Sequence, residues 1–178
     1  LQHEYDRVGL SEDRVWTSMF ALVVADLPEN VRDIWQYGFT EMVNNAIEHS
    51  GSNKITVWVV RNALYTQAWV ADDGEGIFNK IQKALNLSDP REAILELAKG
   101  KFTTDPDNHS GEGIFFSSKV FDLFDIRSGN LHFMHEDGLN DVLVARPKNA
   151  AGTVVVMRLM NDSPRTTKEI FDKFAVPE

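Results

Sequence analysis

The sequence predicts an α+β fold in which helices pack on one sheet, a two-layer α/β sandwich. Its 178 residues, 43% of them hydrophobic and 10% aromatic, are enough for one domain with a sizeable core. Stretches with helical spacing come before and between stretches that alternate like strands. The last strands follow one another in a meander, which is typical of this architecture rather than of a doubly wound fold.

The elements are predicted from the spacing of apolar residues and from the residues that end each stretch. Ser11 can cap a first helix that ends before Pro28, and Phe39, Met42 and Val43 fall at helical spacing in a second helix. Helices are expected at about 11–26, 30–49, 79–86, 90–99, 112–121 and 166–174. Strands are expected at about 54–60, 65–71, 123–127, 131–135, 142–146 and 153–159.

Composition excludes several classes of function. The net charge of −9 argues against a nucleic-acid-binding surface, which needs a basic face. The absence of cysteine excludes disulfides and thiol chemistry and fits a cytoplasmic protein. We expect no membrane contact, because no apolar run has the length of a membrane span. Because the chain starts with Leu1 rather than Met, we expect it to be a piece of a longer protein.

The second predicted helix carries the first candidate site. Glu41, Asn44, Asn45 and Glu48 lie at offsets that share one helix face. A carboxylate can orient or deprotonate a water or hydroxyl, and an amide oxygen is a ligand suited to magnesium. A solvated helix face is the simpler interpretation of this pattern alone. Adjacent asparagines weaken that interpretation, because they are poor helix formers.

A second candidate site follows the predicted strand at 65–71. Asp72 stands where the apolar strand ends, and Gly74 and Gly76 come after it. The Asp72 carboxylate can accept a hydrogen bond from an exocyclic amine such as that of adenine, and the glycines permit close approach of the backbone to a planar ligand. An ordinary acidic turn is the alternative.

Two weaker signals complete the set. Gly111 and Gly113 stand at the opening of a predicted helix, whose first amides can hold an anion, although a flexible loop before a helix explains them as well. The chain has neither the phosphate-binding Gly-Lys-Ser/Thr nor Gly-x-Gly-x-x-Gly, because Phe116 occupies the third glycine position. Gly152 and Thr153 open a strongly apolar strand, and a strand start without any ligand is the alternative there.

The order of these four signals resembles one ATPase superfamily, the gyrase-, heat-shock-chaperone-, histidine-kinase- and mismatch-repair-type (GHKL) proteins. Residues 41–49 resemble its asparagine box, Glu-x-x-x-Asn-Ala, and residues 72–76 resemble its first glycine box, Asp-x-Gly-x-Gly. Residues 110–114 resemble its second glycine box, and Gly152-Thr153 resembles its last Gly-Thr element. The resemblance covers about residues 31–160. It implies a histidine kinase-like ATPase domain with the Bergerat ATP-binding fold: a mixed, mostly antiparallel sheet with helices on one face.

The resemblance also implies a role for each motif residue. Asn45 would ligate Mg²⁺, which bridges the phosphates of ATP, and Glu41 would position the attacking water or acceptor hydroxyl. Asp72 would bind the adenine amine, helped by Gly76 and Thr153 through an ordered water. The remaining cofactor-binding residues are expected at the first glycine box and at the phosphates: Gly74, Gly111, Glu112 and Gly113.

The same resemblance divides the chain. Residues 1–28 are expected to be a helical lead-in, and 29–178 the ATPase domain, with a mobile ATP lid at about 78–110. The polar part of this lid, 101–108, is the kind of stretch expected to move when nucleotide binds. An ordered lid would then report ATP to a protein partner.

Three functions remain open. The spacing from Glu41 to His49 fits the anti-sigma-factor serine-kinase-like branch, a bacterial signal-transduction regulator that phosphorylates or sequesters a protein. An acid at this position favours slow ATP hydrolysis or phosphotransfer to a hydroxyl. The alternatives are the catalytic domain of a histidine kinase and a non-catalytic ATP sensor in a multidomain regulator. A homodimer also remains open.

Overall fold

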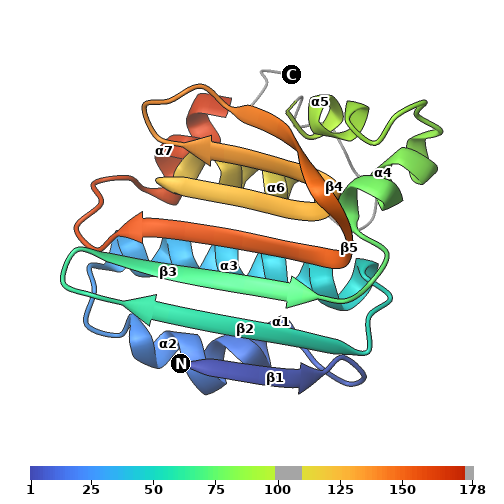
Figure 1. Ribbon diagram of the computed structural model, residues 1–178. Helices are drawn as coiled ribbons and strands as arrows, with labels where there is room; N and C mark the ends of the chain where they lie inside the picture. The colour runs from blue at the N-terminus through green and yellow to red at the C-terminus, as the bar shows by residue number, and fades with distance from the viewer. Residues whose placement is uncertain (99–109, 175–178) are drawn as a thin grey trace.

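The structure is a computed structural model that describes residues 1–98 and 110–174. It has one five-stranded sheet, in which neighbouring strands follow the order β1-β2-β3-β5-β4 and every pairing is antiparallel (Figure 1). The strands are β1 (Gln2–Asp6), β2 (Lys54–Arg61), β3 (Tyr65–Asp72), β4 (Leu123–Glu136) and β5 (Val142–Met160). The α+β two-layer architecture is therefore confirmed, with an antiparallel sheet where a mixed one was expected.

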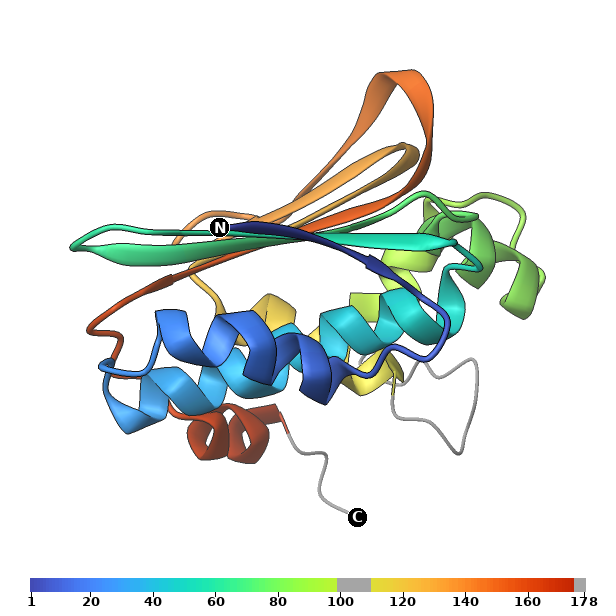
Figure 2. The same ribbon diagram turned by 90° about the horizontal axis from the view of Figure 1, so that it is seen from below.

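The helices form the second layer. Seen edge-on, the N-terminal helices, α3, α6 and α7 lie on one side of the sheet, and the β4–β5 hairpin rises on the other (Figure 2). Helices α4 and α5 lie at one end of the molecule. The helical bounds are α1 (Glu12–Val15), the π-helical turn η1 (Trp16–Phe20), α2 (Ala21–Val23), α3 (Glu29–His49), α4 (Ile77–Leu85), α5 (Glu92–Ala98), α6 (Ser110–Val120) and α7 (Thr167–Phe174).

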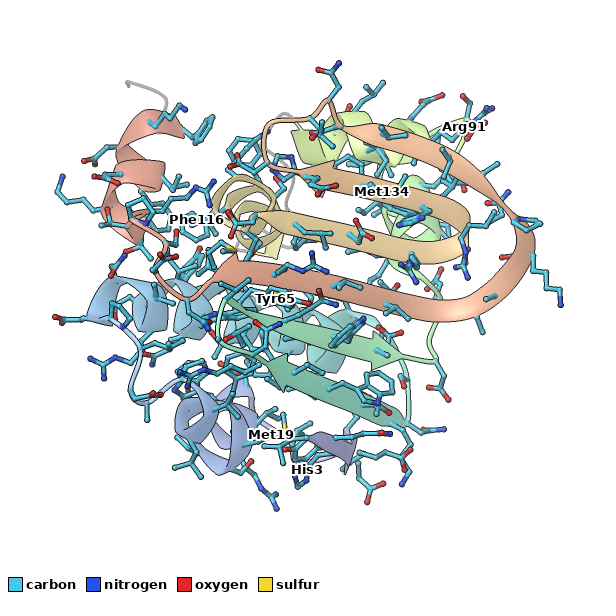
Figure 3. All side chains as sticks on the ribbon, turned by 60° about the vertical axis from the view of Figure 1, so that its left-hand side comes forward. His3, Met19, Tyr65, Arg91, Phe116 and Met134 are labelled. Atoms are coloured by element: carbon cyan, nitrogen blue, oxygen red, sulfur yellow. The ribbon has the colours of Figure 1, made fainter. Side chains whose placement is uncertain are left out.

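The core lies between the two layers. Alternate residues of β2 are buried, namely Ile55, Val57 and Val59, as period-two spacing predicts. Helix α3 buries Trp35 and Phe39 fully in the same core. A second aromatic cluster joins α6 to α7, where the rings of Phe116 and Phe171 stack 4.5 Å apart (Figure 3 labels Phe116). The core thus fixes α3 and α6 against the sheet, which positions the residues described below.

The N-terminal segment differs from the expected helical lead-in at 1–28. Residues Gln2–Asp6 form an edge strand that pairs with β2, so this segment belongs to the sheet. Its polar sequence has no apolar alternation, because an exposed edge strand does not need one. Helix begins only at Glu12, where the Ser11 hydroxyl accepts a hydrogen bond from the amide of Arg14, as its predicted cap role requires.

The four short strands expected at the C-terminal end are two long ones. Strand β4 runs through Gly129, where φ is +56° and the register to β5 shifts. Such a bulge bends a strand without ending it. Its sequence resembles that of a turn, which is why two short strands were expected here. Pro147 is tolerated inside β5 because it falls between the paired residues Ala145 and Ala150, where the register with β4 is irregular.

No helix in the described part of the chain combines the length and apolarity that a membrane crossing requires.

Candidate functional site

Asp72 ends β3 and lines a pocket. The strand register places it opposite Thr153 of β5, and its Oδ1 accepts a hydrogen bond from the amide of Gly74 at 2.9 Å. Burial raises the pKa of Asp72 above its ordinary value of 3.8, and the neighbouring Asp73 adds to the rise. Backbone donors at Gly74 and Thr153 and the charge of Lys80 act against it. A carboxylate that is costly to ionise at the end of a strand is typical of a functional site.

The two glycines after Asp72 are required by close packing. A β-carbon at Gly74 would overlap the carbonyl of Ser50, at the end of α3. Gly76 has φ +92° and precedes α4 as its N-cap, and a β-carbon there would lie 2.7 Å from Ser128 Oγ. These positions therefore need glycine because of packing inside the protein, and the close approach to a planar ligand expected from the sequence stays a prediction.

Gly152 and Thr153 join this loop to β5. Gly152 has φ +80°, and its amide donates to the carbonyl of Gly74 at 2.9 Å. The Thr153 hydroxyl accepts a hydrogen bond from the amide of Ile77 at 2.9 Å and lies 3.1 Å from Ser128 Oγ. Thr153 thus fixes the first residue of α4, a contact that the sequence did not suggest.

The pocket opens between α3, α4 and the sheet and encloses about 680 Å³, its mouth included. Asn45 and His49 line it from α3, and Asp72, Gly76 and Thr153 line it from the sheet end. Its other walls are largely apolar, formed by Met42, Ala46, Val70, Ile77, Ile81, Ile114, Ile126 and Val155. A largely apolar pocket with a few convergent polar groups suits a flat organic ligand.

Asn45 contributes an unsatisfied polar group to this pocket. Its Nδ2 is buried and has no hydrogen-bond partner among the described residues. Buried polar atoms are rarely left without a partner, so this amide is a candidate to donate a hydrogen bond to a molecule in the pocket. Asn45 is thus brought together with Asp72, Gly76 and Thr153, four of the residues that the sequence singled out.

Glu41 lies outside the lining of this pocket. It is one helical turn before Asn45, yet its side chain faces Gly113 on α6, where a β-carbon would overlap Glu41 Oε2. Gly113 is helical and buried, so the second glycine pair forms the start of α6 rather than a loop before it. Gly111 lies in the same helical turn. The side chain of Glu112 and residues 99–109, which include the whole polar part of the expected lid at 101–108, lie outside the described residues.

Lys80 is a pocket residue that sequence reasoning missed. Its Nζ donates to the carbonyl of His49 at 2.5 Å, at the C-terminal end of α3. Ile77, Lys80 and Ile81 all line the pocket, and their spacing of three and four residues places them on one face of α4. This spacing after Gly76 was the signal in the sequence that could have identified Lys80.

The described residues contain no group of three or more His, Cys, Asp or Glu side chains placed to hold a metal ion. A cation in the pocket would therefore take most of its ligands from the bound molecule, with the Asn45 amide oxygen as a suitable protein ligand.

No protein-family model matches the chain, and no curated protein matches it.

Proposed function

We propose that this pocket binds Mg-ATP and that the chain is an ATP-binding regulatory domain with a Bergerat-type fold. The observation that carries the proposal is the Asp72 carboxylate, which stands at the end of β3 in a largely apolar pocket. The antiparallel sheet with helices on one face is compatible with this fold.

The adenine base would lie at the Asp72 end of the pocket. Apolar side chains such as Met42, Ile77 and Val155 can cover the two faces of a planar ring. The carboxylate can accept the hydrogen bond that the exocyclic amine of adenine donates. Burial contributes affinity at this end, and Asp72 contributes selectivity for an amine over a carbonyl.

The phosphates would lie toward α6. The Asn45 amide offers an oxygen to Mg²⁺ and an unsatisfied donor to a phosphate oxygen. The first turn of α6, which contains Gly111 and Gly113, has backbone amides without intrahelical acceptors. We further propose that residues 78–110 act as the lid over this end.

Glu41 would contribute to turnover of ATP rather than to its binding. Its carboxylate lies beside α6 and outside the pocket lining, where it can position a water or a protein hydroxyl against the phosphates. We expect Glu41→Ala to keep ATP affinity within about twofold of wild type and to reduce hydrolysis or transfer by about 100-fold or more. Equal turnover in the variant would remove this role.

The product of turnover separates the proposed regulatory classes. An acid in the asparagine box favours phosphotransfer to a serine hydroxyl, as in the anti-sigma serine-kinase-like branch. Incubation with γ-labelled ATP and candidate protein partners tests this assignment. Label on a serine supports it, label on a histidine supports a histidine-kinase domain, and binding without turnover supports an ATP sensor.

Calorimetry tests the proposal itself. Mg²⁺ and a non-hydrolysable ATP analogue, titrated into folded protein, should give saturable heat at one site. Asp72→Ala should weaken this binding by about tenfold or more, because the amine loses its acceptor. Asp13→Ala, an exposed acid on α1, serves as the matched control and should bind as wild type does. Absence of heat with the wild-type protein would refute the proposal.

A further inference from the structure

Two lysines of α4 are in opposite situations. Lys83 is 74% exposed and forms an ion pair with Glu75. Lys80, one turn earlier, lines the pocket and is partly buried, yet it forms no ion pair within 4.0 Å with any described residue. Surface charges do not need partners, whereas buried charges usually have one. The exposed Lys83 is therefore ion-paired and the partly buried Lys80 is not, which is the reverse of what burial alone would require.

The environment of Lys80 destabilises the charged form of its side chain. Burial lowers the pKa of Lys80, and the nearby carboxylates of Glu75 and Asp72 offset only part of this effect. An ammonium group carries three donors, and a single bond, to the carbonyl of His49, is found among the described residues. A group with donors to spare in a ligand-sized pocket is suited to binding an anion.

No other lysine or arginine side chain in the described lining of the pocket can take the place of Lys80. Lys80 is the only Lys or Arg among the described residues that line the pocket. Lys119, on α6, lies over the rings of Phe115 and Phe174 at 5.5 and 5.8 Å from their centroids. With a net charge of −9, the chain needs a local positive charge wherever it holds a phosphorylated ligand.

We propose that Lys80 binds a phosphate group of the nucleotide and so makes the site select nucleotides over nucleosides. This inference rests on the proposed function. Lys80 extends from the first turn of α4, which begins at Ile77, toward the α3 wall that carries Asn45 and His49. A phosphate near this wall would take the free donors of the ammonium group, and the bond to His49 would keep the side chain in place.

The test compares ATP with adenosine in calorimetric titrations of wild type, Lys80→Met and Lys83→Met. Methionine keeps the length and apolar stem of lysine without its charge. We expect Lys80→Met to weaken ATP binding by about tenfold or more and adenosine binding by less than about twofold, because only ATP presents an anion. Lys83→Met should leave both affinities unchanged.

Three results would overturn the inference, and they are distinguishable. If wild type binds ATP and Lys80→Met binds it equally well, Lys80 is not a phosphate ligand. If Lys80→Met loses ATP and adenosine to the same extent, Lys80 supports the pocket through its bond to α3 instead. If wild type binds neither compound, the proposed function fails and the inference fails with it. A denaturation curve for each variant establishes that the titrated protein is folded.

Discussion

The sequence Gly-Glu-Gly-Ile-Phe occurs twice, at 74–78 and at 111–115, and the two copies fold differently. In the first copy, Gly76 has φ +92° and precedes α4, in a loop packed against the end of α3. In the second copy the residues lie in the first turns of α6, and Gly113 is helical. The Gly-Glu-Gly part of the motif thus forms a loop in the first copy and a helical turn in the second, whereas Ile-Phe is helical in both.

The neighbours of each copy explain the difference. Gly74 and Gly76 are placed by strand pairing, because the register sets Asp72 opposite Thr153 and the chain must then turn between Ser50 and Ser128. Gly113 meets only a side chain, that of Glu41. Backbone atoms held in a helix or strand cannot move away from an added β-carbon, whereas the end of a side chain can. We therefore expect the first copy to be sensitive to substitution and the second to be tolerant.

The largest effect is expected from Gly74→Ala. The new methyl group would overlap the carbonyl and carbon atoms of Ser50, and both segments are held by the sheet and α3. We expect a loss of about 3 kcal/mol or more in the free energy of unfolding, measured by urea denaturation. Gly138→Ala, where φ is +78° but nothing lies within 4 Å, should lose only about 1 kcal/mol. Equal losses would show that the packing at Gly74 is not tight.

A moderate effect is expected from Thr153→Val. Valine keeps the shape of threonine but leaves the amide of Ile77 without its acceptor, and Thr153 is only 6% exposed. We expect a loss of about 1–3 kcal/mol in the free energy of unfolding and faster hydrogen exchange at the Ile77 amide. Thr17→Val, at an exposed position of η1, should change stability by less than about 0.5 kcal/mol. Unchanged exchange at Ile77 would contradict the assigned contact.

A smaller effect of opposite sign is expected from Asp72→Asn. Burial raises the pKa of Asp72, so the ionised carboxylate destabilises the folded state and this cost grows as pH rises through the raised pKa. The two backbone donors that favour the carboxylate limit the cost. The variant should be more stable than wild type at pH 7, and the difference should vanish as pH falls below 3.8. A less stable variant at pH 7 would contradict this account.

The smallest change in stability is expected from Gly113→Ala. Alanine is favoured over glycine in a helix by about 1 kcal/mol, which offsets the displacement of the Glu41 carboxylate. We expect stability within about 1 kcal/mol of wild type. Because Glu41 must move, ATP turnover should fall while ATP affinity stays unchanged. A large loss of stability would show that α6 cannot adjust here.

The fold could be predicted where packing follows local pattern. Helix α3 and strands β2 and β3 show clear apolar spacing, and the structure has them within a few residues of the expected bounds. Strand β1 was missed because edge pairing requires no apolar pattern. The long strands β4 and β5 were each predicted as two shorter strands, because bulges and turns use the same residue types.

The candidate site could be predicted only in part. Asp72, Gly76 and Thr153 meet as expected because strand register brings the motifs together. Glu41 shares a helix face with Asn45, but only the position of α6 shows that it faces Gly113. Lys80 belongs to no motif, and its partial burial and its lack of an ion pair with the described residues depend on where α4 lies relative to the end of α3.

The central claim is that the Asp72 carboxylate selects the amine of adenine. Competition between ATP and inosine triphosphate, which carries a carbonyl in place of that amine, tests it most directly. Wild type should prefer ATP by about tenfold or more, and Asp72→Asn should lose this preference because its amide can donate to the carbonyl. Equal affinity of wild type for both nucleotides, or an ATP preference that survives in Asp72→Asn, would contradict the account.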